Sequence, residues 1–454
     1  MIFKGDVQSI VNEDGEIHLV GGSYKNVSFP AKEINCSLKL SSSKIHDLSF
    51  TRANVNKSIS FDDNLEIDNL FFESTNLYDR WDFYECSIWE TNYLHKSNFY
   101  EQVVIRKESH NPRLTLANVY AKQNFSIDYA SNIESLDISD CRFDSNFNLY
   151  CYEQDIDYES NGIMCNISGV IHGNAVFENV PITHLSIGAV NFGNLTFNRI
   201  RTKLIFLQYF HNNNKLTISN IVLDKNYNLL LIYDSNINDT EFININFKKF
   251  DEVVIAKSNV SNILLSNSLF PRKIQTETKL PTLGYKIEPH ENINKNMYYR
   301  ETYRQLKLAM EKQGNRNLAL QFKAKEMHHL RKELKIGWDK TLLYLNFISN
   351  NHGISWIRGI IFTIAIGYVF FCIYNSTLSD QYFYWDINSS REQTKEAFIF
   401  GLNHFSSFIA SFPKLRLDDN SNTWQTNLSV LASRIFIGYG IYQTITSFRK
   451  YGGK

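Results

Sequence analysis

Two groups of three carboxylates are spaced closely enough to converge on a substrate: Glu153, Asp155 and Asp157, and Asp137, Asp140 and Asp144. The first group alternates around one isoleucine and would line one face of a strand. Paired carboxylates carry out acid–base and nucleophilic steps in glycoside hydrolysis. The histidines of the same region are scattered and form no triad with a nucleophile: His172, His184 and His211. We therefore interpret both carboxylate groups as solvated corners and loops, and we expect no catalytic residue and no enzyme.

Metal and cofactor chemistry has little support in the pattern. The chain has six cysteines without Cys-x-x-Cys pairing, namely Cys36, Cys86, Cys141, Cys151, Cys165 and Cys372. They are typical of buried residues in a reducing compartment, and a disulfide between Cys141 and Cys151 is the alternative that the sequence does not decide. Adjacent His328 and His329 point about 100° apart on a helix and cannot readily share one metal. We expect no metal and no cofactor.

The chain has no net positive charge that would attract nucleic acid, because 47 basic residues balance 47 acidic ones. Residues 1–20 carry five charged side chains and lack the apolar core of a signal peptide. We expect no nucleic-acid partner, and we expect the N-terminal region not to be secreted.

Apolar runs near the C-terminus indicate a membrane module over residues 351–454. Residues 354–374 and 428–448 are each long enough for a transmembrane helix, at about 1.5 Å per residue across roughly 30 Å of hydrocarbon. Residues 396–412 are apolar but shorter, which fits a re-entrant or interfacial segment. The sequence thus predicts two spans with a short segment between them, and the lipid bilayer as a partner.

Polar residues inside these runs are the pore or gating candidates. They are Arg434 in the second run and Asn403, His404, Ser407 and Ser411 in the short segment. A charge at this depth snorkels to headgroups, lines a pore or pairs with a carboxylate such as Glu396. Irregular backbone within a membrane needs cover from protein, so a pore implies a homo-oligomer.

Gly438-Tyr439-Gly440 is similar to a potassium filter but lies inside the last run, where no inner helix follows. We interpret Gly438 and Gly440 as small residues for close helix packing.

Residues 1–275 show short apolar alternations that end in Asn or Asp, such as those beginning at Leu114, Leu136, Leu195 and Leu216. Alternation over four to six residues is the strand signature, and the steps of 22 and 21 residues indicate a repeat. We predict a parallel β-helix-like solenoid of degenerate coils of about 20 residues, with Asn at the corners. A β-sandwich pair is the competing interpretation.

Residues 290–350 change to a helical period, with Tyr299, Tyr303, Leu306 and Met310 on one face and Gly314-Asn315 as a turn. A second helix follows, then a basic run and an aromatic face over residues 338–347 that suits a membrane interface. We predict a helical connector between scaffold and membrane module.

The connector carries a family resemblance in YRQLK at 303–307, GN at 314–315 and ALQFKAKEM at 319–327. Together with the start of the first span at Gly353, Trp356 and Arg358, it resembles bacterial pentapeptide-repeat or β-helix membrane proteins. In those proteins a coil scaffold precedes a C-terminal two-helix, ion-channel-like module. The resemblance covers residues 296–454, although His352 stands where an aromatic residue is usual.

The short apolar segment, with Arg434 and His404, favours a channel-like effector or sensor. In this hypothesis the β-helix binds an unknown protein partner and acts through the hairpin on an oligomeric pore. Positive charges flank both spans, so both termini are expected in the cytoplasm of a cell with an inner (plasma) membrane. The alternative is a non-conducting, membrane-anchored scaffold whose coils dock proteins. A membrane-bound carbohydrate enzyme is a weaker third interpretation.

Overall fold

A computed structural model describes residues 2–4, 10–11, 17–30, 33–62, 64–83, 86–105, 112–128, 133–151, 162–225, 227–271, 274–276, 278–280, 285–287, 294–377, 391–410 and 424–448. The chain divides into two compact units, Met1–Tyr298 and Tyr299–Lys454.

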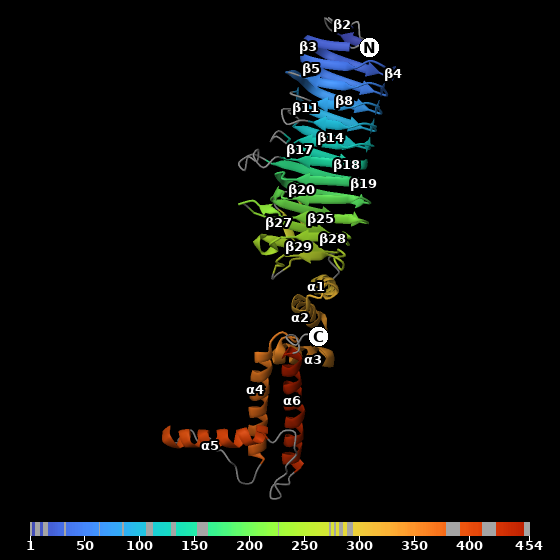
Figure 1. Ribbon diagram of the computed structural model, residues 1–454. Coiled ribbons are helices and arrows are strands. Elements are labelled where there is room, and N and C mark those ends of the chain that lie inside the picture. The colour runs from blue at the N-terminus through green and yellow to red at the C-terminus, as the bar shows by residue number, and fades with distance from the viewer. Residues whose placement is uncertain are drawn as a thin grey trace. The chain divides into compact units, whose positions relative to one another are not determined.

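The first unit is a β-solenoid whose short strands stack in successive coils (Figure 1). Its strands are β1 Ile2–Lys4, β2 Ile10–Val11, β3 Ile17–Pro30, β4 Glu33–Ile34, β5 Leu38–Thr51, β6 Asn54–Val55, β7 Ile59–Asp62, β8 Leu65–Glu73, β9 Asn76–Leu77, β10 Trp81–Phe83, β11 Cys86–His95, β12 Asn98–Phe99, β13 Val103–Ile105, β14 Arg113–Ala117, β15 Tyr120–Ala121, β16 Phe125–Asp128, β17 Ser135–Ser139, β18 Arg142–Tyr150, β19 Ile163–Glu178, β20 Ile182–Asn191, β21 Asn194–Asn198, β22 Arg201–Thr202, β23 Leu204–Gln208, β24 His211–Asn212, β25 Lys215–Ser219, β26 Val222–Leu223, β27 Leu229–Tyr233, β28 Thr240–Ile243, β29 Glu252–Ala256 and β30 Leu264–Ser266. The short helix η2 is Phe247–Lys249, and β31 Thr278–Leu280 pairs antiparallel with β32 Tyr285–Ile287.

Parallel pairing between coils sets the repeat. Leu70, Asn92, Leu114 and Leu136 are in register on successive strands, at steps of 22 residues. The next step, from Leu136 to Cys165, is longer, at 29 residues. The solenoid prediction is confirmed, and the β-sandwich alternative is wrong because these strands pair in parallel with the next coil.

Identical side chains stack inside the solenoid, as the alternation requires. Phe29, Phe50 and Phe72 stack with ring centroids 4.7 and 4.6 Å apart, and all three are buried. Such rings stack because coils are separated by one strand spacing of about 4.8 Å.

Asparagines form a second ladder at the corners. The side chain of Asn76 donates to that of Asn54 at 2.8 Å, and Asn98 donates to Asn76 at 2.7 Å. A later ladder joins Asn220, Asn244 and Asn267, which all have positive φ. Asparagine tolerates this left-handed backbone, which explains its recurrence at the end of each alternation.

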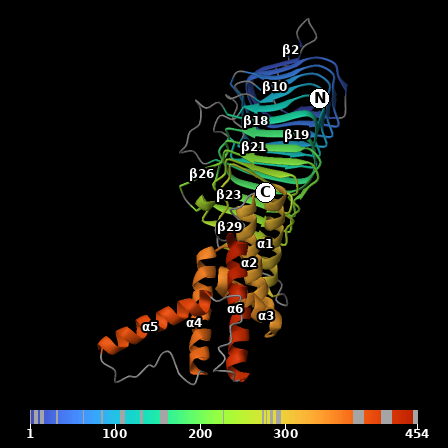
Figure 2. The same ribbon diagram turned by 60° about the horizontal axis from the view of Figure 1, so that its bottom comes forward.

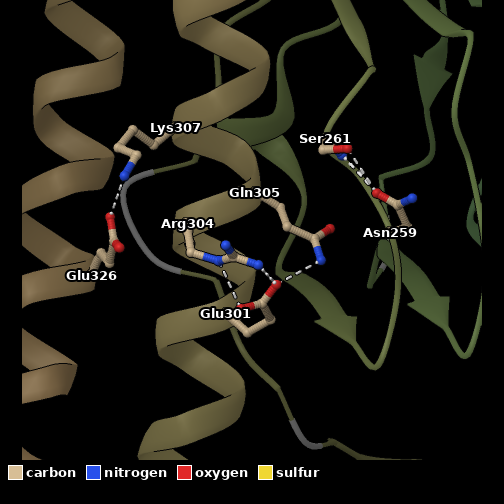
Figure 3. A network of polar contacts seen from close by, with 7 residues as sticks. All are labelled: Asn259, Ser261, Glu301, Arg304, Gln305, Lys307 and Glu326. Atoms are coloured by element: carbon tan, nitrogen blue, oxygen red, sulfur yellow. Dashed lines mark hydrogen bonds and ion pairs between the residues drawn. The ribbon is translucent and has the colours of Figure 1, made fainter.

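The helical connector begins as a hairpin of α1 Lys295–Lys312 and α2 Arg316–Glu333. Gly314 has a φ of +71°, and the Asn315 side chain accepts from the backbone of Leu318, so the turn both ends α1 and caps α2. Lys307 and Glu326 join the two helices through a 2.9 Å ion pair (Figure 3). Glu326 is buried, so this pair holds the hairpin from within.

Four more helices follow: α3 Trp338–Asn350, α4 Trp356–Ser376, α5 Arg391–Ala410 and α6 Trp424–Phe448. Helices α4 and α6 run side by side and antiparallel, while α5 diverges from both of them (Figures 1 and 2). Residues 396–410 of the short segment expected at 396–412 therefore belong to a 20-residue helix that begins at Arg391, and residues 411 and 412 lie outside the described residues.

Candidate functional site

The carboxylates of the solenoid do not converge. Asp144 accepts hydrogen bonds from Arg142 at 2.8 Å and Tyr120 at 2.7 Å, and these bonds lower its pKa. Asp137 accepts from Asn166 at 2.8 Å, on the next coil. Each side chain therefore ties the solenoid together locally.

Asp140 also has a structural role, because it accepts from the backbone of Val170 at 2.9 Å. Glu153, Asp155 and Asp157 lie outside the described residues. Within the described part of the chain, no three His, Cys, Asp or Glu side chains gather as metal ligands.

The other expected ligands of the solenoid are dispersed. His172 stacks on Phe192, His184 contacts Thr183, and His211 lies in the short strand β24. Cys141 and Cys151 are buried free thiols, so the disulfide left open by the sequence is not formed.

Helices α4 and α6 pack through two glycine–threonine contacts. A Cβ on Gly359 would lie 2.5 Å from Thr444 Oγ1, and a Cβ on Gly440 would collide with Thr363 Oγ1. Each threonine hydroxyl donates to its own helix, Thr363 to the Gly359 carbonyl at 2.8 Å and Thr444 to the Gly440 carbonyl at 2.9 Å. Gly438 is partly buried on the same helix. The two helices thus pack too closely to enclose a pore between them.

A buried amide network joins α3 to the C-terminal half of α6. Asn350 Nδ2 donates to the Gln443 carbonyl at 3.0 Å and to Gln443 Oε1 at 2.5 Å. Asn346 Oδ1 accepts from Tyr439 at 2.7 Å and from Gln443 Nε2 at 2.8 Å. Because Asn350 is 1% exposed, these bonds are shielded from water and fix α3 to α6.

A turn of three consecutive residues with positive φ precedes α4, namely Asn351, His352 and Gly353. The Ser355 hydroxyl accepts from the Arg358 backbone and caps the helix. Trp356 stacks on Phe448 at 5.0 Å, so the first turn of α4 lies beside the last turn of α6.

Arg434 of α6 contacts the last turn of α5. Its Nη1 donates to the Phe408 carbonyl at 3.2 Å, and its guanidinium lies 5.3 Å from the Phe408 ring centroid. That carbonyl belongs to the last turn of α5, where helix carbonyls lack intrahelical partners. Arg434 therefore anchors α5 to α6, and the snorkelling, pore-lining and carboxylate-pairing roles stay predictions.

The last turns of α5 pack against the other two helices. Phe371, Phe408 and Ile437 form a buried cluster, with Phe405 and Ile409 against it. Of the other gating candidates, Asn403 and Ser407 are exposed, His404 is partly buried, and Ser411 lies outside the described residues. Phe408 and Arg434 thus place one end of α5, and its exposed polar residues lie on the remaining faces.

Apolar side chains cover the outer faces of α4 and α6. The exposed ones are Ile357, Ile361, Ile364, Val369 and Ile373 on α4, and Leu428, Leu431, Ile435, Tyr442 and Ile445 on α6. Among the helices of the described residues, Trp356–Ser376 is the one that is long and apolar enough to cross a membrane. Exposed apolar surface on this scale is typical of a binding or membrane surface.

No known protein family, curated protein or solved structure matches this chain.

The solenoid has one further feature that could receive a partner. A cleft of about 790 Å³ lies near its C-terminal end, where β22 and β26 form a separate pair. Val222, Lys225, Tyr227 and Lys249 contribute to its lining. Its volume falls within the range of small-molecule or peptide-side-chain sites.

The sequence indicated close helix packing at Gly440, but its analysis missed the threonine partners, the contact at Gly359 and the amide network. Gly359 and Thr363, like Gly440 and Thr444, are spaced four residues apart, which is the small-x-x-x-small pattern of close helix packing. The amide network gave no local signal, because Asn350 and Gln443 are 93 residues apart in the chain.

Proposed function

We propose that this protein is a membrane-anchored, channel-like effector or sensor. The observation that carries this proposal is the apolar outer surface of α4 and α6, where Ile361 is 61% and Ile435 is 64% exposed. Burial of such a surface in lipid removes it from water, at about 25 cal/mol per Å².

The second span of this proposal is α6. Its 25 residues extend for about 37 Å, at 1.5 Å per residue, which exceeds the roughly 30 Å of hydrocarbon. Several of its polar side chains face inward, since Ser429, Ser433 and Gln443 are buried. Antiparallel α4 and α6 would then return the chain to its starting side.

Basic residues give the orientation. Arg331, Lys332, Lys335 and Lys340 precede α4, and Arg449, Lys450 and Lys454 follow α6. In this proposal the protein lies in the inner membrane of the cell. By the positive-inside rule, both ends of the chain and the solenoid are then on the cytoplasmic side.

A pore requires several copies, because α4 and α6 pack too closely to enclose one. We propose a homo-oligomer in which the α5 helices, held by Arg434, contribute Asn403, His404 and Ser407 to the conducting path. The solenoid binds a protein partner, and the amide network between α3 and α6 passes the connector's movement to the membrane helices.

The alternative is a non-conducting scaffold, favoured by the stacked solenoid surface and its 790 Å³ cleft. One experiment separates the two: the full chain is purified in detergent, its oligomeric mass is measured, and it is reconstituted into liposomes loaded with an ion-sensitive dye. Oligomers that release ions are the expected result. A monomer in sealed liposomes contradicts the pore and leaves the scaffold.

Arg434→Leu is the matched variant for the α5 anchor, with Ile435→Leu on the exposed face as its control. The proposal expects Arg434→Leu to change ion release while Ile435→Leu does not. Unchanged release in both variants removes Arg434 from the mechanism.

A further inference from the structure

Arg331, near the end of α2, is a buried cation without a carboxylate partner among the described residues. The residue is 8% exposed. Its guanidinium carbon lies 4.1 Å from the Phe347 ring centroid and 4.5 Å from that of Tyr344, both on α3. Cation–π contacts of this kind compensate only part of the lost hydration of a charge.

The hydrogen bonds of this guanidinium are also incomplete. Nη2 lies 3.3 Å from His328 Nδ1, while Nη1 is buried and has no hydrogen-bond partner within the described part of the chain. The C-terminal end of α2 supplies a partial negative charge of only about half a unit. The site therefore retains an excess of positive charge.

His352 brings a second incomplete donor to the same ring. It is 9% exposed, its ring centroid lies 6.1 Å from that of Phe347, and its Nε2 is likewise buried without a partner among the residues described. Burial, with Arg331 next in effect, lowers the pKa of His352 to about 4. The cationic surroundings thus oppose a second positive charge at His352.

The surroundings favour an anion that arrives from the membrane side. Arg358 lies over the same Phe347 ring at 5.9 Å and sits in the first turn of α4. Along α3 the apolar side chains Trp338, Leu342 and Ile348 are exposed, which gives this helix an uncovered apolar stripe. Tyr344 is half exposed while its ring centroid lies 4.5 Å from the guanidinium carbon, so this side chain contacts both the guanidinium and solvent.

We propose that Arg331 and His352 form a binding site for one phosphate group, at the junction between the connector and α4. Arginine is suited to this ligand because its planar fork donates two parallel hydrogen bonds to phosphate oxygens. The phosphate completes the hydrogen bonds of Nη1 and supplies the missing negative charge. A phospholipid headgroup and a free phosphate share this chemistry, and the test separates them. The inference uses the proposed membrane association but does not require a pore.

The test measures the thermal unfolding midpoint of the full chain in neutral detergent and phosphate-free buffer. Three probes are added separately: dioctanoyl phosphatidic acid, dioctanoyl phosphatidylcholine and sodium phosphate. We expect phosphatidic acid to raise the midpoint in a saturable way. A rise with phosphatidic acid alone identifies a lipid headgroup, and a comparable rise with sodium phosphate identifies a free anion.

Two variants of equal charge decide whether the site is specific. Arg331→Met removes the buried guanidinium, and Lys332→Met removes an exposed cation one residue away. We expect Arg331→Met to weaken the response to the effective probe by roughly tenfold or more, the effect of losing one charge-assisted hydrogen bond, while Lys332→Met responds as the unmodified chain does.

His352→Leu supplies a second, independent variant if Arg331→Met does not fold. It is expected to weaken the response in the same direction. Equal responses in all variants, or no response of the unmodified chain to any probe, overturn the proposal. Because ion release is not measured, a sealed liposome in the earlier experiment contradicts the pore and leaves this site standing.

Discussion

Gly440 of α6 lies against Thr363 of α4 so closely that a single added carbon would collide with the threonine hydroxyl. One turn away the order is reversed, and Gly359 of α4 lies against Thr444 of α6. Each helix therefore offers its partner both a glycine and a threonine. This reciprocity sets the separation of the two helices and makes the pair sensitive to side-chain size.

Gly440→Leu is expected to destabilise the helical unit by about 1–3 kcal/mol, because overpacking forces the two helices apart. Denaturation in detergent, followed by circular dichroism, measures this loss. Ala365→Leu is the control, since Ala365 is exposed on α4 and its enlargement should change stability by less than about 0.5 kcal/mol. Similar losses in both variants would mean that α4 and α6 do not pack through these residues.

Asn350→Leu is expected to cost about 1–3 kcal/mol, because it leaves buried groups of Gln443 without a donor. The double variant Asn350→Leu/Gln443→Leu should lose less than the sum of the single variants, since both side chains belong to one network. Chemical denaturation of all four proteins in a double-mutant cycle tests this coupling. Strict additivity would show that the two residues act independently.

The ion pairs of the α1–α2 hairpin differ in burial and should differ in effect (Figure 3). Glu326→Gln leaves the partly buried Lys307 without its charged partner and is expected to cost up to about 3 kcal/mol. Glu301→Gln breaks the solvent-exposed pair with Arg304 and should cost less than about 1 kcal/mol. Thermal unfolding of both variants, side by side, gives the comparison. The ranking is wrong if Glu301→Gln is the more destabilising change.

Stability of the helical unit is expected to fall in mild acid. His329 stacks on Tyr299 at 4.6 Å, and burial lowers its pKa from 6.5 to about 4. The unfolded chain therefore binds a proton at His329 at a higher pH than the folded chain, so stability declines as the pH falls from 6.5 towards 4. His329→Phe keeps a stacked ring but cannot titrate, and it should flatten this part of the profile. Unfolding midpoints across the pH range measure the slope, and an unchanged slope in His329→Phe would contradict the assignment.

The solenoid could be predicted from sequence because its determinants are local. Alternating apolar residues define each strand, and the asparagines that end them adopt the left-handed backbone at the corners, as at Asn220 and Asn244. The 22-residue steps follow from the same pattern. The 29-residue step from Leu136 to Cys165 interrupts the period, and such irregular spacing left a β-sandwich as an alternative.

The helical unit was less predictable because its determinants are tertiary. The apolar run that begins near residue 396 indicated a short segment, but α5 extends back to Arg391 through polar residues that a hydropathy pattern does not assign to it. The role of Arg434 depends on a carbonyl 26 residues earlier in the chain. The sequence shows that a charged residue lies in a helix. Which other helix end that residue contacts depends on the tertiary structure.

The side-chain ladders of the solenoid also bear on how such a protein can change its length. The side chain of Asn76 bonds to the equivalent asparagines in the coils directly before and after it, and Phe50 stacks in the same manner. A coil gained or lost by gene duplication or deletion therefore meets the same chemistry on both of its faces. Evolution can lengthen or shorten this scaffold in increments of one strand spacing, about 4.8 Å, without redesigning its interior.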